Sequence, residues 1–311
     1  MAAFEYQMPR ATTSSNTVRS GSRRLMPILP DDKESLISDT KGGQKELPIL
    51  LMLDVSPSMR DNDRIGQQNT AVHKFLAALC QNSKVRNAAR VAFCLFTKKI
   101  VYRTGFMKLN ELTFQPGAYL EKTLLSEVKY AEEGKVKTFL VNFPVFKAAE
   151  KDGTNIPLAV SEAVEIMQEY TRGLAGRKVQ KYVPFLLFTS DGNPDLTQNP
   201  DYTAEIQSYY MDQTREAADS INRVCNREKN INELIVPFFI GIGDAQKSYL
   251  ERFSKNFPMG VIMVDNRLDN LTFSSIFSHI AEAIAQSLVM QNTSGALLNT
   301  LTKKITNIYD A

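Results

Sequence analysis

The chain has 311 residues, of which 43% are hydrophobic and 23% charged, and 37 basic against 34 acidic side chains leave a net charge of +3. Such a composition fills a substantial core and excludes a wholly disordered chain. The near-neutral balance argues against a protein that coats nucleic acid or an anionic membrane through bulk charge. No apolar run approaches the ~20 residues that cross a bilayer, and the N-terminus lacks an apolar signal segment. We therefore expect neither a membrane nor a nucleic acid as partner.

The cysteines are too few and too widely spaced for a disulfide framework. There are three of them, Cys80, Cys94 and Cys225, and an odd number cannot all pair within one chain. We expect buried free thiols in a reducing compartment, which indicates the cytoplasm, and we expect a bacterial source.

Both ends of the chain differ in composition from the middle. Residues 1–45 are rich in Ser, Thr, Arg, Gly and Pro without a sustained period, which is typical of a flexible arm. Residues 291–311 are polar and are expected to form a tail. A single domain is predicted over 46–290.

Within 46–290, short apolar runs alternate with amphipathic stretches. This pattern predicts an α/β fold: a doubly wound, Rossmann-like and mostly parallel sheet with helices on both faces and one antiparallel edge strand. Apolar stripes at helical spacing predict helices through Ile65–Leu79, Leu158–Met167, Ile206–Val224 and Ile276–Leu288. The expected strands are Pro48–Asp54, Arg90–Phe96, Ile100–Thr104, Tyr182–Thr189, Leu234–Gly241 and Gly260–Val264.

One connection is longer than the alternation requires. Residues 105–150 form an insertion that we expect to be a subdomain with some strand and helix of its own, because long connections of this kind are often functional.

The candidate metal-binding side chains begin where the first predicted strand ends. Asp54, Ser56 and Ser58 occupy alternate positions directly after a buried apolar run. Alternate side chains of extended backbone point the same way, so these oxygens converge at the sheet edge where open α/β folds bind ligands. An all-oxygen cluster suits Mg²⁺ or Mn²⁺ better than zinc or copper.

Two later loops reach the same edge. Thr154 follows a glycine just before a helix that has Pro157 in its first turn, and Asp191 ends a second buried strand ahead of a turn glycine. The predicted metal site therefore comprises Asp54, Ser56, Ser58, Thr154 and Asp191. Asp54, Ser56 and Ser58 alone would equally suit a polar turn that caps the next helix.

These positions resemble the von Willebrand factor A (vWA) domain with its metal-ion-dependent adhesion site (MIDAS). The D-x-S-x-S motif matches at Asp54, Ser56 and Ser58, the threonine at Thr154 and the later aspartate at Asp191. The loops Asp-Gly-Thr-Asn and Thr-Ser-Asp-Gly-Asn-Pro look most like the bacterial TerY-like type associated with tellurium resistance. Pro57 stands where the family usually has glycine.

The resemblance implies a non-enzymatic protein–protein interaction module. In the family the serines and threonine bind the metal directly, the aspartates often act through water, and an Asp or Glu of a partner completes the metal's shell. Relatives imply a stress-response or defence system with a PP2C-type phosphatase, a protein kinase or an AAA+ ATPase as companion.

Two other functions use the same ion. One is a metal-dependent phosphoester hydrolase, which needs a general base near the metal, and the sequence offers none. The other is a structural subunit of a larger assembly, in which a neighbouring copy supplies the carboxylate.

Overall fold

The computed structural model describes residues 45–192, 204–225, 234–255, 260–264 and 270–289. The predicted arm and tail lie outside these ranges, apart from Lys45. None of the described helices is long and apolar enough to cross a membrane.

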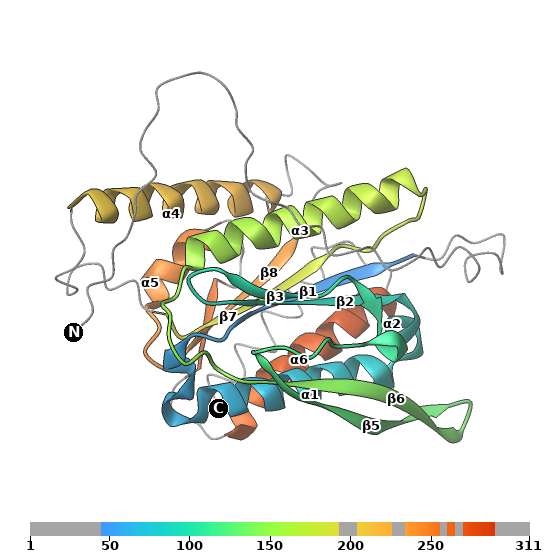
Figure 1. Cartoon of the computed structure of the whole chain (residues 1–311). Coiled ribbons are helices and arrows are strands. Elements are labelled where there is room, and N and C mark those ends of the chain that lie inside the picture. The colour runs from blue at the N-terminus through green and yellow to red at the C-terminus, as the bar shows by residue number, and fades with distance from the viewer. Residues whose placement is uncertain (1–44, 193–203, 226–233, 256–259, 265–269, 290–311) are drawn as a thin grey trace. The chain divides into compact units, whose positions relative to one another are not determined.

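The centre is a seven-stranded sheet in the order β3-β2-β1-β7-β8-β9, with β4 also paired to β2 (Figure 1). Strands β1, β2, β7, β8 and β9 run parallel, and β3 and β4 run antiparallel to β2. Their bounds are β1 Leu47–Asp54, β2 Ala89–Phe96, β3 Ile100–Arg103, β4 Met107–Lys108, β7 Phe185–Ser190, β8 Val236–Ile242 and β9 Val261–Val264.

Helices cover both faces of this sheet (Figure 1). Helices α1 and α6 pack on one face with the odd-numbered β1 side chains such as Leu51, while α3 and α4 pack on the other with Leu50 and Met52. Every residue of β1 is buried, as a strand covered on both sides should be. The helices are α1 Arg64–Gln81, α2 Ser83–Ala88, α3 Ile156–Gly176, α4 Ala204–Val224, α5 Lys247–Leu250 and α6 Asn270–Val289, with 3₁₀ turns η1 Pro57–Asp63, η2 Leu109–Glu111 and η4 Glu251–Phe253.

The doubly wound prediction is confirmed, with an antiparallel edge next to β2. The six expected strands all form, and the largest displacement is at β7, which begins at Phe185 and not at Tyr182. The segment before Phe185 contains Pro184, which has no N–H to donate to a ladder.

The insertion is chiefly a long hairpin of β5 (Leu120–Glu132) and β6 (Lys135–Phe146), which pair antiparallel as a separate sheet. Glu133 and Gly134 both have positive φ, 53° and 74°, which is the backbone of a two-residue turn that matches strand twist. The helix expected in this insertion is reduced to the single turn η2.

Side chains of α1 hold the hairpin against the domain. The Asn69 amide donates to the Phe146 carbonyl at 2.8 Å and accepts from the Phe146 N–H at 2.9 Å. The His73 ring contacts the Pro144 carbonyl at 2.8 Å and stacks on Phe143. Both contacts are near the base of the hairpin, so they fix how β6 leaves the domain.

Asn69→Ala is expected to lower the free energy of unfolding by about 2 kcal/mol, because it leaves a buried N–H and a buried C=O of Phe146 without partners. Urea unfolding measures the change. The control is Gln67→Ala on the same helix, whose exposed contact with Asn62 should contribute less than about 0.5 kcal/mol. Equal losses in the two variants would contradict this role.

The cysteines are buried and free, as predicted. Burial raises the pKa of each thiol, Cys80, Cys94 and Cys225, to about 12. These thiols are therefore protonated at neutral pH and behave as small apolar side chains.

Candidate metal centre

Asp54 is the last residue of β1 and is fully buried. One carboxylate oxygen, Oδ1, accepts the Ser56 N–H at 2.8 Å, and the other, Oδ2, accepts the Ser190 hydroxyl at 2.6 Å. Burial, followed by the nearby charge of Asp191, raises the pKa of Asp54 to about 7. The charge of Asp191 thus disfavours the charged form of Asp54, and a cation bound beside Asp54 would relieve this.

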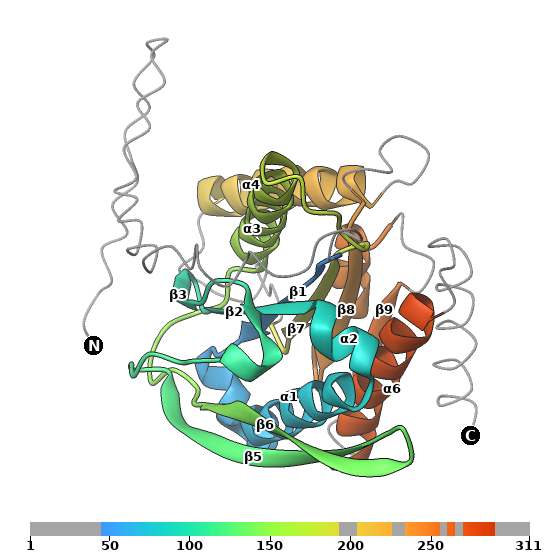
Figure 2. The same ribbon diagram turned by 90° about the vertical axis from the view of Figure 1, so that its right-hand side faces the viewer.

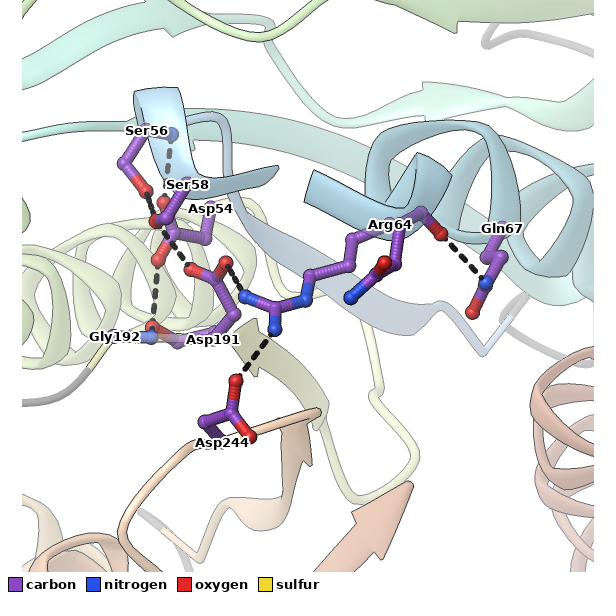
Figure 3. Close-up of polar contacts among 10 residues, drawn as sticks. Asp54, Ser56, Ser58, Arg64, Gln67, Asp191, Gly192 and Asp244 are labelled. Carbon is purple, nitrogen blue, oxygen red and sulfur yellow. Dashed lines mark hydrogen bonds and ion pairs between the residues drawn. The ribbon is translucent and has the colours of Figure 1, made fainter. Parts of the chain in front are cut away.

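The two serine hydroxyls lie beside these carboxylates (Figure 3). Ser56 Oγ is 3.1 Å from Ser58 Oγ, and the Ser58 hydroxyl donates to Asp191 Oδ1 at 2.9 Å. Ser56 is at the N-cap position of η1, yet its side chain accepts no capping hydrogen bond. Pro57 begins η1, where a missing N–H costs no helical hydrogen bond, so it fits the motif.

Thr154 reaches this edge from the loop before α3. A Cβ on Gly192 would lie 2.8 Å from Thr154 Cγ2 and 2.9 Å from Ser190 Oγ. The loop of Thr154 and the loop after β7 therefore touch, and a larger residue at 192 would force the Thr154 and Ser190 side chains to shift. The structure brings all five predicted residues, Asp54, Ser56, Ser58, Thr154 and Asp191, to the same end of the sheet.

Arg64, which the sequence analysis did not single out, inserts into this cluster (Figure 3). Its guanidinium donates to Asp191 Oδ2 at 2.8 Å and to Asp244 Oδ2 at 2.9 Å. The side chains of Arg64 and Asp191 are 6% and 0% exposed, whereas that of Asp244 is 82% exposed. Burial opposes the charge of Arg64, but the two carboxylates raise its pKa overall.

Further polar contacts fix the strand ends. Gln68 of α1 donates to the Asp54 carbonyl at 3.0 Å and accepts the Thr189 hydroxyl at 2.6 Å. The bonds from α1 to β1 and β7 hold the two carboxylate-bearing strand ends in register.

The donor set fits a small hard cation. Adjacent ligands of an octahedral Mg²⁺ lie about 3 Å apart, which matches the separation of 3.1 Å between Ser56 Oγ and Ser58 Oγ. The described residues contain no group of three or more His, Cys, Asp or Glu side chains that could hold a metal, so a site here depends on hydroxyls as well as carboxylates. Such a set favours Mg²⁺ or Mn²⁺ over Zn²⁺.

Four contacting residues were missed: Arg64, Gln68, Ser190 and Asp244. Ser190 and Asp54 are the residues directly after the paired Leu53 and Thr189 on two neighbouring parallel strands, and this alignment of the strand ends could have suggested the contact. Arg64 opens an amphipathic helix, where an arginine usually faces solvent, so its sequence position carried no signal.

Comparison with known proteins gives distant structural likenesses. No family model matches the chain, and no curated protein matches it. Similar solved structures include the pilus adhesin SpaC of Lactobacillus rhamnosus GG, with 13% identity over 80% of this chain and 32% of that chain and a TM-score of 0.47. The proximal thread matrix protein 1 of the mussel byssus has 14% identity over 80% of this chain and 49% of its own, with a TM-score of 0.38. The pilus adhesin RrgA of Streptococcus pneumoniae has 10% identity over 81% and 45%, with a TM-score of 0.38.

This chain spans about a third to a half of the length of those structures. Likenesses at these identities and TM-scores assign neither a family nor a function.

Proposed function

We propose that this chain is a vWA-type, non-enzymatic interaction module that holds Mg²⁺ or Mn²⁺ at a MIDAS formed by Asp54, Ser56, Ser58, Thr154 and Asp191. The observation that carries the proposal is the convergence of Ser56, Ser58 and Asp191 within hydrogen-bonding distance beside the buried Asp54. Arg64 already pairs with Asp191, so Asp54 is the buried carboxylate whose charge a bound cation or a proton would still compensate.

Each side chain has a distinct role in this proposal. The hydroxyls of Ser56, Ser58 and Thr154 offer neutral oxygens, while Asp54 and Asp191 supply negative charge that several hydrogen bonds already orient. A bound Mg²⁺ would supply a positive charge with one open coordination position. An Asp or Glu side chain of a partner protein fits that position by charge and hardness.

The cellular setting is part of the same proposal. Three buried free thiols support the cytoplasm. We place the module in a bacterial stress-response or defence system of the tellurium-resistance type, and its companion would be a PP2C-type phosphatase, a protein kinase or an AAA+ ATPase.

Metal binding tests the proposal first. Titration calorimetry with Mg²⁺ and with Mn²⁺ should show one site in the wild type, and Ser58→Ala should weaken it by more than about tenfold. The control is Asp61→Ala, which removes an exposed aspartate from the same η1 turn and should leave affinity unchanged.

Recognition of an acidic side chain is tested next. Peptides that contain Glu should bind the Mg²⁺-loaded protein more tightly than peptides with Gln at the same position, and a chelator should abolish the difference. Metal binding without any Glu preference would reject the adaptor role while retaining the metal site.

A further inference from the structure

The hairpin of β5 and β6 has one unpaired strand edge. Among the described residues β5 pairs with β6 alone, apart from a bridge between its first residue Leu120 and Gly117. Figures 1 and 2 both show β5 along the lower margin of the domain, with α1 and β6 above it. Most of β5 from Glu121 to Ala131 is exposed, in contrast to the buried strands of the central sheet. Unpaired edges of this length are templates for another strand.

The direction of the free backbone groups follows from the register. Thr123 pairs with Pro144, which has no N–H, so this pair is one of those that exchange no hydrogen bonds. Because such pairs alternate along an antiparallel ladder, every second residue from Thr123 to Ala131 directs its N–H and C=O away from β6. The two-residue turn at Glu133 and Gly134 gives the same alternation.

The side chains of these residues also face away from α1. Val128 is 7% exposed and packs into the core with its pair Phe139, so its neighbours Glu127 and Lys129 lie on the opposite face. That outer face has solvent-exposed apolar side chains: Leu125 is 65%, Leu140 52% and Val136 74% exposed.

The charged side chains of this edge are complementary to those of a second copy of the same edge. Glu127 and Lys129 flank Val128, both are exposed, and neither forms an ion pair with the residues that the structure describes. In an antiparallel copy centred on Val128, Glu127 of each chain lies opposite Lys129 of the other. A shift of two residues in either direction instead places two glutamates or two lysines face to face, which is unfavourable.

The same register brings apolar side chains of the two copies side by side on the outer face. Leu125 of one copy lies opposite Ala131 of the other, and Ala131 is itself paired with Val136. Each half of the joined sheet then has a continuous apolar row, which consists of Val136 and Ala131 of one copy and Leu125 of the other. Four strands are also a more stable sheet than an isolated pair.

We propose that the β5 edge is a self-association surface, at which two copies of this chain pair β5 against β5 in antiparallel register centred on Val128. The resulting symmetric dimer has one four-stranded sheet that spans both copies. It does not depend on a bound metal ion.

Charge exchange at the edge tests this proposal. Sedimentation velocity of the full chain, with EDTA throughout, should show a concentration-dependent dimer. Glu127→Lys and Lys129→Glu should each weaken it by at least about tenfold, because like charges then face each other twice. The double variant Glu127→Lys/Lys129→Glu, and an equimolar mixture of the two single variants, should regain dimers.

Matched controls carry the same charge changes elsewhere. Lys178→Glu just after α3 and Glu165→Lys on α3 alter exposed residues on or next to the helix that packs on the sheet face opposite α1, and they should leave the dimer intact. A wild-type chain that is monomeric at every concentration would overturn the proposal and leave this edge to a different partner. A dimer that the single variants do not weaken, or that the mixture does not regain, would overturn it as well.

Discussion

Asp54→Asn is expected to make the metal-free protein more stable at alkaline pH while abolishing Mg²⁺ binding. Burial and the charge of Asp191 raise the pKa of the wild-type carboxyl from its ordinary value of 3.8 to about 7, so the folded state disfavours its charged form. The asparagine side chain has nearly the same shape as the aspartate side chain but carries no charge. Above pH 7 the gain is on the order of 2 kcal/mol, measured by urea unfolding in EDTA.

The sign of the pH dependence follows from the direction of this shift. A raised pKa means that the folded state keeps a proton that the unfolded chain has lost. The contribution of Asp54 to stability is therefore greatest below about pH 4 and declines as the pH rises through about 7. Asp54→Asn should remove this decline, and Mg²⁺ should reduce it in the wild type. Identical pH profiles for the wild type and Asp54→Asn in EDTA would contradict the prediction.

Arg64→Ala is expected to lower the free energy of unfolding of the metal-free protein by about 3 kcal/mol, because the buried carboxylate of Asp191 loses its charged partner. Mg²⁺ should then recover more stability in this variant than in the wild type, since the cation takes over the compensation of that carboxylate. Thermal unfolding with and without Mg²⁺ measures both effects.

The control for this variant is Arg60→Ala, which removes an exposed arginine from η1. It should change neither the stability nor the response to Mg²⁺. A loss of stability in Arg64→Ala that Mg²⁺ leaves unchanged would show that Arg64 supports the fold without any relation to the metal.

The fold was predictable because its signals are local. Parallel strands such as β1 are buried on both faces, so they stand out as unbroken apolar runs, and α1 shows its core-facing stripe at Val72, Phe75 and Leu79. The convergence of Asp54 with Asp191 was predictable for a topological reason: parallel strands end at the same edge of a sheet.

The missed features depend on tertiary contacts. Arg64 meets Asp191 across 127 positions of the sequence, and no local pattern distinguishes it from a solvent-facing arginine. The hairpin was predicted only as a subdomain, because β5 is largely exposed and its residues do not alternate cleanly between apolar and polar. Residues with solvent on both sides carry little information about strands.

The central claim is that Asp54, Ser56, Ser58, Thr154 and Asp191 hold a divalent cation. A crystal structure grown with Mn²⁺, with an anomalous difference map at the manganese edge, tests it most directly. The account predicts a peak bonded to the hydroxyls of Ser56 and Ser58, and no such peak in Asp54→Asn crystals. A wild-type map without a peak at this sheet edge, or with manganese bound only elsewhere, would contradict it.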